Sequence, residues 1–324
     1  PSQQEDPDLF VHITKRDEKG VYITGAKAHQ TGCINSHWIL VMPTMRLREE
    51  DKNYAIVGAV PADAEGITYI YGRQSCDTRS MEEGDLDAGN SKYSGQEAMI
   101  IFDNTFIPNE LIFMDGENDY AAMLIERFTC YHRRSYVCKT GLGDVLIGAA
   151  ASISDYNGIG NASHIKDKLV EMTHLNETIF GTGVASSFQA YKTKAGNYQN
   201  DDMLANVCKH NVTRFPYEIS RLAQDIAGGL VVTMPAEQDF RSPETGPLLE
   251  KYLKGKKGVP IENRMRILRL IENMTLGRNA VGYLTESMHG AGSPQAQRIQ
   301  IARQMQLEYK KKIARRLANI PETE

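Results

Sequence analysis

Short runs of aliphatic, β-branched and aromatic residues fill the first third of the sequence, and Gly, Pro, Asn and Asp separate them. Runs of this length between turn-forming residues are typical of antiparallel strands. The pattern therefore predicts an antiparallel β-domain over residues 1–116. The six predicted strands cover residues 9–14, 21–26, 38–42, 55–60, 67–71 and 98–102.

From about Asp119 the apolar residues recur at three and four positions, which is the period of an amphipathic α-helix. Residues 166–174 and 267–274 show this spacing. The pattern predicts that a C-terminal helical bundle, residues 117–324, follows the β-domain. The fold class expected from the two halves is α+β.

Two details of the helical half also follow from its pattern. One long helix is expected to begin near Leu204 and to end at the glycines after Ala227. Residues 239–260, which are rich in Gly, Pro and Lys, are expected to form a loop before the last two helices.

Length, charge and composition exclude several kinds of partner. A chain of 324 residues with 41% hydrophobic and 24% charged residues suits two packed units of an ordinary globular protein. A net charge of −4 creates no field that attracts nucleic acid, so a small-molecule partner is favoured. The start at Pro1, without Met, indicates a cut inside a longer chain.

Hydropathy and cysteine usage predict where the protein works. No apolar run reaches the roughly 18 residues that a membrane-spanning helix needs, so the protein is not expected to span a membrane. The five cysteines form an odd set without CxxC spacing, which suits a reducing compartment. A cytoplasmic location is therefore predicted. The cysteines are Cys33, Cys76, Cys130, Cys138 and Cys208.

The densest group of chemically active side chains lies at residues 130–139. In a helix, His132, Tyr136 and Lys139 are four and seven positions apart and share one face. A potential base, acid and cation on one face suit acid–base or redox chemistry. The alternative is a satisfied buried His and Tyr among solvated arginines, and the spacing does not decide between them.

Three further segments are candidate binding elements. Paired glycines after Gln224 allow a backbone or a phosphate to approach closely, although such glycines more often only cap a helix. In residues 285–294, Glu286 stands beside a loop of small residues and could face a ligand; a helix connection with a solvated Glu is the favoured alternative. Residues 27–32 place hydroxyl and amide groups after a strand, where they suit a heteroaromatic ring or form a polar β-turn.

Six segments together carry a resemblance that no single motif would carry. The chain resembles the 4-hydroxybutyryl-CoA dehydratase family, within a flavin-dependent group that includes the 4-hydroxyphenylacetate 3-monooxygenases. The similarity extends over essentially the whole chain. The segments are residues 1–10, 25–32, 72–79, 102–104, 168–178 and 285–298.

The resemblance implies an acyl-CoA dehydrogenase-like fold whose N-terminal helical domain is absent from this chain. It also implies homotetramers that bind FAD at subunit interfaces. Gln224, Gly228 and Gly229 resemble the Gln-x-x-x-Gly-Gly element that contacts the FAD of a neighbouring subunit.

The same resemblance implies two sets of cofactor-binding residues. His29, Gln30 and Thr31 match the positions where the family holds the flavin. A [4Fe-4S] cluster held by three cysteines and one histidine is also implied, and His132 and Cys138 match two of its ligands. The other two cysteines belong to the upstream domain.

One departure from the family pattern concerns these two ligands. His132 and Cys138 are six positions apart, where the family has seven. An offset of seven puts both side chains on one helix face, whereas an offset of six rotates the second by about 100°. Cluster binding by Cys138 therefore requires a local distortion of the helix, or else one residue is missing from this sequence between the two ligands.

The implied reaction is the radical dehydration of 4-hydroxybutyryl-CoA to crotonyl-CoA, with isomerisation of vinylacetyl-CoA beside it. FAD takes and returns one electron, and an iron of the cluster accepts the departing hydroxyl. We expect His132 to act as the base, Glu286 and Tyr136 as acid–base partners, and Lys139 as a flavin or substrate contact.

Two alternatives remain open. One is a flavin monooxygenase of the 4-hydroxyphenylacetate type, which uses reduced flavin and oxygen and needs no cluster. The other is a non-catalytic assembly subunit, because a chain without its first domain could keep the fold and the oligomer contacts alone.

Overall fold

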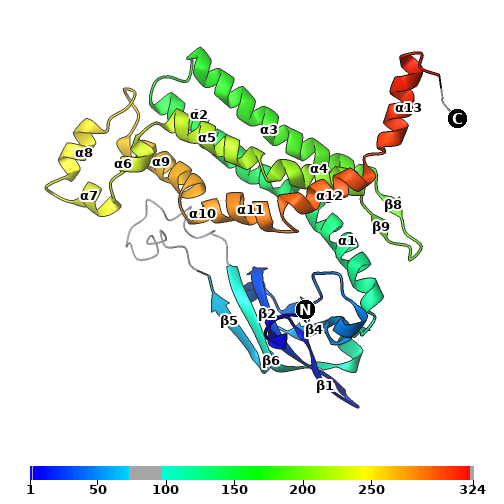
Figure 1. The fold of residues 1–324 in the computed structure, drawn as a ribbon. Coiled ribbons are helices and arrows are strands. Elements are labelled where there is room, and N and C mark those ends of the chain that lie inside the picture. The colour runs from blue at the N-terminus through cyan, green and yellow to red at the C-terminus, as the bar shows by residue number, and fades with distance from the viewer. Residues whose placement is uncertain (2, 73–96, 322–324) are drawn as a thin grey trace. The chain divides into compact units, whose positions relative to one another are not determined.

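The computed structural model describes residues 1, 3–72 and 97–321. They form two compact units. The first, the β-unit, consists of Pro1–Phe128 and Leu276–Gly282, and the second, the helical unit, consists of Thr129–Thr275 and Tyr283–Glu324. The chain passes from the first unit to the second inside helix α1 (Asn118–Ser135), as the ribbon in Figure 1 shows.

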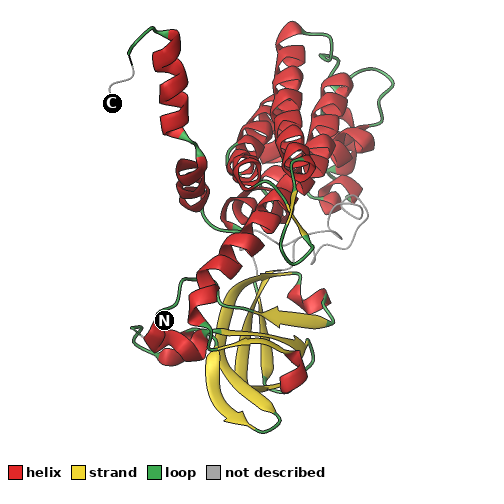
Figure 2. Ribbon diagram, turned by 90° about the vertical axis from the view of Figure 1, so that its right-hand side faces the viewer, coloured by secondary structure: helices red, strands yellow, loops and turns green. Residues whose placement is uncertain are grey.

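The β-unit contains two antiparallel sheets, one with the strand order β1-β2-β6-β5 and one with the order β3-β4-β7. Figure 2 shows these strands in yellow. Their pairing is antiparallel throughout, which confirms the predicted sheet type. The strands are β1 (His12–Asp17), β2 (Gly20–Thr31), β3 (Trp38–Val41), β4 (Ile56–Pro61), β5 (Ile67–Tyr71), β6 (Glu97–Pro108) and β7 (Ile112–Asp115).

Alternating burial along the central strands builds the core of the β-unit. Ile23 of β2 and Phe102 and Ile107 of β6 are each 0% exposed. The burial phase of β6 slips at Asn104, which has a φ of 54°. There the register gains one residue on β6, because Ile23 pairs with Thr105 while Gly25 pairs with Phe102. This is a β-bulge, and it keeps the apolar side chains on both sides of Asn104 inside.

All six predicted strands have a counterpart, although β2 and β6 extend beyond the predicted ends and the first strand begins at His12 instead of Leu9, because residues 7–9 form a 3₁₀ turn. Strand β7 was not predicted. Its four residues, Ile112–Asp115, are too few to show an alternating pattern on their own. Cys76 and the other members of the family-like segment 73–79 lie outside the described residues.

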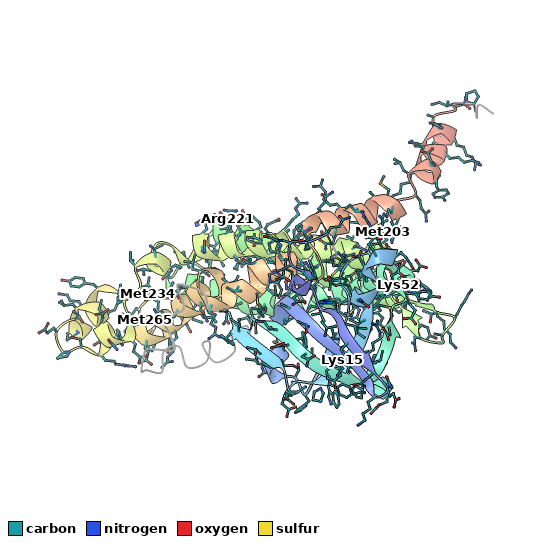
Figure 3. The ribbon with its side chains drawn as sticks, turned by 60° about the horizontal axis from the view of Figure 1, so that its bottom comes forward. Lys15, Lys52, Met203, Arg221, Met234 and Met265 are labelled. Carbon is teal, nitrogen blue, oxygen red and sulfur yellow. The ribbon has the colours of Figure 1, made fainter. Side chains whose placement is uncertain are left out.

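The helical unit contains five long helices; four of them, α2, α3, α5 and α9, share one apolar core, and α4 packs in a second cluster with Tyr136 and Ile179, which confirms the predicted α+β fold class. Met265 of α9, labelled in Figure 3, is one of the fully enclosed side chains at 1% exposure. Helices α2 and α3 cross closely at Gly143, where an added Cβ would lie 2.1 Å from the Asn176 Oδ1 atom. The helices are α2 (Lys139–Tyr156), α3 (Ser163–Phe188), α4 (Asp202–Val212), α5 (Phe215–Ala227) and α9 (Ile261–Thr275).

Two expectations for this half were wrong. The single helix predicted from Leu204 onward is two helices, α4 and α5, because the chain breaks at residues 213–214 and Pro216 begins α5. Proline suits the first turn of a helix but cannot continue one. Residues 239–260 are not only loop, since they overlap two short helices, α7 (Glu237–Arg241) and α8 (Gly246–Tyr252).

The chain after the long core helices forms several short elements rather than two helices. A π-helical turn, Val281–Thr285, directly precedes α11. The remaining elements are α6 (Leu230–Thr233), α10 (Arg278–Ala280), α11 (Glu286–His289), α12 (Pro294–Gln304), α13 (Leu307–Leu317) and the hairpin of β8 (Tyr191–Lys192) and β9 (Tyr198–Gln199).

Among the described residues, one helical stretch, Asn118–Tyr156, is long and apolar enough to cross a membrane by length and composition alone. Its most apolar window has a mean hydropathy of only 1.2, and core helices of globular proteins pass the same test. Leu146, Ala150 and Ile153 from this stretch are each 0% exposed within the helical core. We therefore interpret its second part, α2, as a core helix.

Candidate active site

A carboxylate with both oxygens bound is at the centre of the candidate site, which lies within the helical unit. The Tyr136 hydroxyl donates to Glu286 Oε1 over 2.7 Å, and the Lys139 Nζ donates to Glu286 Oε2 over 2.9 Å. The Lys139 and Glu286 side chains are 13% and 19% exposed. At this burial the ion pair is screened far less than a surface pair.

A change of helix type allows Tyr136 and Lys139 to reach the same carboxylate. Residues Tyr136–Cys138 form a 3₁₀ turn between α1 and α2. In a 3₁₀ helix, side chains three positions apart lie directly above each other, whereas in an α-helix they are about 60° apart. The turn therefore aligns the phenol and the ammonium, one for each oxygen of Glu286.

His132 lies one helical turn before Tyr136 and stacks on its ring. The two ring centroids are 5.3 Å apart, with an angle of 29° between the planes. Burial lowers the pKa of His132 below its ordinary value; the nearby cations Lys209, Arg133 and Lys139 act in the same direction, while Glu286 opposes them. The imidazole is therefore neutral near pH 7 and can accept a proton.

A π-helical turn and a glycine flank Glu286 in the chain. The π-helical turn Val281–Thr285 ends immediately before it, and such turns are often found at functional sites. Gly290 follows it, and a Cβ at that position would lie 1.6 Å from the Tyr136 hydroxyl oxygen. Only glycine leaves room for the phenol to reach the carboxylate.

Two buried cations surround this group, and neither was predicted. Lys209 of α4 is 0% exposed, and its Nζ lies 4.3 Å from the centroid of the Tyr136 ring. Burial lowers the pKa of Lys209 to about 7. Arg133 is 6% exposed and donates to the Ala291 carbonyl over 3.0 Å and to Asn206 Oδ1 over 2.9 Å.

The sequence does carry a signal for Lys209. Ala205, Cys208 and Val212 occupy the core-facing positions of α4, and the spacing of three, four and seven places Lys209 in the same stripe. A lysine in an apolar stripe is rarely buried without a function or a partner. That single exception in the helical period could have identified it.

The structure contradicts the alternative for Glu286 and one part of the alternative for residues 130–139, whose Tyr136 is buried and hydrogen-bonded as that alternative expected. Arg133 is buried and bonded, so this member of the arginine pair is not solvated. Glu286 is not a solvated helix-end carboxylate, because both of its oxygens accept hydrogen bonds from side chains of the helical unit.

The implied cluster ligands have the right chemistry but do not form a complete set. Cys138 is exposed, whereas Cys130 is buried against Asn200, whose Nδ2 lies 3.2 Å from its sulfur. Within the described ranges, no three His, Cys, Asp or Glu residues are grouped so that they could hold a metal ion. The 3₁₀ turn distorts the helix in the direction that an offset of six would need, because three residues at 120° turn Cys138 roughly 60° back toward the His132 face, which is part of the roughly 100°.

The predicted flavin residues of the β-unit lie at the end of β2. Ala28 and His29 form a second bulge, since Lys27 pairs with Ile100 while Gln30 pairs with Ala98. Bulges of this kind often redirect side chains next to a binding site. His29 and Thr31 are exposed and Gln30 is half-buried.

Two side chains beside that bulge are fixed. The Thr31 hydroxyl donates to Glu97 Oε2 over 2.6 Å. The Lys27 Nζ donates to the Met42 carbonyl over 2.6 Å, and burial lowers the pKa of this lysine to about 8.

The other predicted flavin element lies on the helical unit, at the end of α5. The Gly228 amide donates to the Gln224 carbonyl over 2.9 Å, so Gly228 does cap the helix. Its φ of 77° and ψ of −173° are open essentially to glycine alone. Both Gly228 and Gly229 are exposed, and an added Cβ at either would meet no atom within 4 Å. The backbone is therefore accessible to an approaching group.

The structure thus brings His132, Tyr136, Lys139 and Glu286 into one cluster and adds Lys209 to it. Cys138 belongs to the same turn. The segments His29–Thr31 and Gln224–Gly229 belong to different units, and each is arranged as an accessible end of a strand or a helix.

Comparison with known proteins gives consistent matches for both halves. Family models described as 4-hydroxyphenylacetate 3-hydroxylase N terminal and C terminal match residues 1–114 and 121–319. The chain is 58% identical, over 99% of its length and 67% of the relative, to 4-hydroxybutyryl-CoA dehydratase/vinylacetyl-CoA-Delta-isomerase of Clostridium aminobutyricum.

Two solved structures show how far the likeness extends. An oxygen-tolerant archaeal 4-hydroxybutyryl-CoA dehydratase from N. maritimus matches with a TM-score of 0.97 and 76% identity, over 100% of this chain and 65% of that one. The oxygenase component of 4-hydroxyphenylacetate 3-monooxygenase complexed with FAD matches with a TM-score of 0.86, 23% identity, and 98% and 66% coverage. The second likeness shows the fold alone. The chain spans about two thirds of the length of these proteins.

Proposed function

The chain belongs to the 4-hydroxybutyryl-CoA dehydratase family, and from this membership we propose that the full-length protein dehydrates 4-hydroxybutyryl-CoA to crotonyl-CoA. We propose that it also isomerises vinylacetyl-CoA to crotonyl-CoA. The observation that carries the proposal is the Glu286 carboxylate held between Tyr136 and Lys139, beside a neutral His132.

The chemistry of the reaction requires this kind of group. A proton must leave the α-carbon, a second must leave the β-carbon, the hydroxyl must leave the γ-carbon, and one proton must be returned to the γ-carbon, so that the net loss is one water. His132 is half-buried and neutral, so it can take a proton from the substrate at a ring nitrogen. Tyr136 can pass a proton along its hydrogen bond to Glu286.

Lys139 contributes charge and position to the same group. Its ammonium lies 2.9 Å from Glu286 Oε2, which favours the ionised carboxylate and fixes its orientation. A fixed carboxylate that accepts from a phenol is a proton acceptor ready for use, because no rearrangement is needed at the moment of transfer.

FAD is the cofactor that these residues would serve. We propose that His29, Gln30 and Thr31 hold the flavin ring and that Gly228 and the residues beside it, Gln224 and Gly229, meet the FAD of a neighbouring subunit. The exposed, glycine-only backbone at Gly228 supports this, because nothing within 4 Å blocks an approaching phosphate. When bound, the flavin supplies the one-electron chemistry that the unactivated β-proton requires.

A [4Fe-4S] cluster is proposed for the full-length protein only, with His132 and Cys138 as two of its ligands. The described residues alone do not make a complete site. A histidine bound to iron through one nitrogen, with its proton on the other, has no basic lone pair left. Ligation and base catalysis at His132 are therefore alternatives, and the acid–base roles of Tyr136 and Glu286 hold with either one.

We further propose that the protein acts as a cytoplasmic homotetramer on an acyl-CoA substrate. Free thiols support a reducing compartment: in the part of the chain that the structure describes, all four cysteines, Cys33, Cys130, Cys138 and Cys208, are free. The exposed Gly228–Gly229 backbone supports a subunit contact.

The test is turnover by the full-length protein purified without oxygen. We expect crotonyl-CoA from both 4-hydroxybutyryl-CoA and vinylacetyl-CoA, together with bound FAD, iron and sulfide. Cys33→Ser is a matched control for Cys138→Ser, because Cys33 lies in the core of the β-unit. Only the Cys138 variant should lose iron.

The rival function has a different signature. A flavin monooxygenase would hydroxylate 4-hydroxyphenylacetate with reduced flavin and oxygen and would contain no iron. Product from that assay, with no crotonyl-CoA formed, would replace the dehydratase proposal. Absence of both activities in an FAD-replete protein would favour the assembly subunit.

A further inference from the structure

Lys209 makes contacts that the proposed acid–base roles of His132, Tyr136 and Glu286 do not explain. Its side chain is 0% exposed, its Nζ faces the Tyr136 ring at 4.3 Å, and the same atom donates to the Ser287 carbonyl and, over 3.3 Å, to the Met288 carbonyl. Both carbonyls follow Glu286 directly in the chain.

Burying the Lys209 amine costs free energy, so its position indicates a specific role. Burying a charged lysine costs several kcal/mol unless hydrogen bonds and favourable charges offset the loss of water. An apolar residue at position 209 would suit the packing beside Ala205, Cys208 and Val212, although α4 also buries Asn206, which is bonded to Arg133. The two carbonyls and the Tyr136 ring are what a lysine adds.

The segment that Lys209 binds needs an external anchor. Helix α11, Glu286–His289, is the last part of a helical stretch of twelve residues, Arg278–His289, that changes to a π-helical turn in its middle, and a helix of this length is only marginally stable by itself. The last carbonyls of any helix also have no partner within the helix. The N–H donors of a buried lysine satisfy these carbonyls.

We propose that Lys209 is a positioning residue: by binding the Ser287 and Met288 carbonyls it fixes α11, and so keeps Glu286 against Tyr136. The effect on turnover rests on the function proposed above, whereas the effect on the backbone of α11 does not. Arg133, through the Ala291 carbonyl, anchors the next turn of the chain from α1.

The test substitutes Lys209 in the full-length enzyme. Lys209→Met keeps the apolar stem and removes the donor, so Glu286 moves from its place by local loosening of α11. We expect kcat to fall about 10²-fold while KM for the acyl-CoA stays within about twofold, because a misplaced group costs transition-state stabilisation and not uniform binding. Amide hydrogen exchange of residues 286–290 should rise at least about tenfold.

Lys209→Gln is a second variant that keeps the proposal testable if Lys209→Met does not fold. The amide keeps one donor, so this variant should retain slower exchange at 286–290 and at least about tenfold more turnover than Lys209→Met. Arg264→Met is the matched control: Arg264 also holds a backbone carbonyl, that of Leu253, but away from the Glu286 group. It should lose stability and keep kcat.

The outcomes separate the two proposals. If amide hydrogen exchange at residues 286–290 is as slow in Lys209→Met as in the wild type, the positioning role is overturned. This holds whether or not kcat falls. If the unsubstituted enzyme forms no crotonyl-CoA, the proposed dehydratase function fails, and the exchange experiment still decides whether Lys209 anchors α11.

Discussion

The Glu286 carboxylate accepts one hydrogen bond from a phenol and one from an ammonium, and this pairing makes a specific prediction. Glu286→Gln keeps the shape but replaces the acceptor for Lys139 by an amide that cannot take up a proton. We expect turnover of 4-hydroxybutyryl-CoA to fall about 10²-fold or more, with FAD content unchanged. Crotonyl-CoA formation is the measurement.

Glu218→Gln is the matched control for this change. Glu218 also binds a cation, Arg221, over 2.7 and 2.9 Å, but the pair is exposed on α5. Loss of this ion pair should change the free energy of unfolding by no more than about 0.5 kcal/mol and leave the turnover rate unaltered. If both variants kept wild-type turnover, Glu286 would have no place in the reaction. A loss confined to dehydration, with vinylacetyl-CoA isomerisation retained, would place Glu286 at hydroxyl departure.

Lys27 of the β-unit gives a pH-dependent prediction at the same scale. Burial lowers the pKa of Lys27 to about 8 in the folded state, against 10.5 for the ordinary group. Between these values the unfolded chain still binds the proton that the folded protein has released, so stability rises with pH. The destabilisation that comes from burying the charged lysine is fully present below pH 8 and is absent above about pH 10.5.

The measurement is the free energy of unfolding by urea from pH 7.5 to 10.5. Lys27→Met removes the titrating group, so the wild type should gain about 3 kcal/mol relative to the variant across this range. Lys15→Met, on the exposed side of β1, is the control and should follow the wild-type pH dependence. Parallel curves for the wild type and Lys27→Met would contradict the effect of burial.

At the scale of elements, the close crossing of α2 and α3 predicts opposite effects for two glycines of one helix. A Cβ at Gly143 would lie 2.1 Å from Asn176 Oδ1, and the Asn176 amide is fixed by the Thr140 carbonyl and by Asp144. Gly143→Ala must push the helices apart and should cost about 1–3 kcal/mol.

Gly148 provides the internal control for the helix itself. It lies on the same helix, is exposed, and a Cβ there would meet no atom within 4 Å. Gly148→Ala should stabilise the protein by up to about 1 kcal/mol, because alanine loses less backbone freedom in a helix. Equal effects of the two substitutions on the midpoint of urea unfolding would show that the crossing is not as tight as the structure has it.

At the scale of the whole molecule, each of the two units contains a candidate flavin segment, and the one at Gly228 gives a prediction about FAD retention. Gly228→Asp places a charge and a side chain on a residue whose φ is 77°. If this backbone meets the FAD pyrophosphate of a neighbouring subunit, the variant should lose most of its flavin and some of its tetramer. FAD content after gel filtration is the measurement.

Gly258→Asp controls for backbone strain. Gly258 also has a positive φ, 86°, and open space around its Cα, but it lies in the loop before α9. This variant should fold less stably and keep its FAD. A Gly228→Asp protein that remains tetrameric with full FAD would remove this element from the flavin site.

The sequence by itself determined the order of elements and the chemistry available. Short β-rich runs between turn-forming residues marked six strands, and the change to the helical period marked the start of α1 within one residue of Asp119. Residue types and long family-like segments indicated His132, Tyr136, Lys139 and Glu286 as site candidates. Such signals are local, because each depends only on the residues within a few positions of one another.

Only the tertiary structure decided which of these side chains meet. Tyr136 and Glu286 are 150 positions apart, and no periodicity relates them. The 3₁₀ turn at Tyr136–Cys138 aligns Tyr136 with Lys139, and its residues would equally suit a continuous α-helix by propensity. The burial of Lys209 likewise depends on helices that pack against α4. Long-range packing selects among local conformations of nearly equal free energy, so it brought together the four side chains that the sequence could only suggest as candidates.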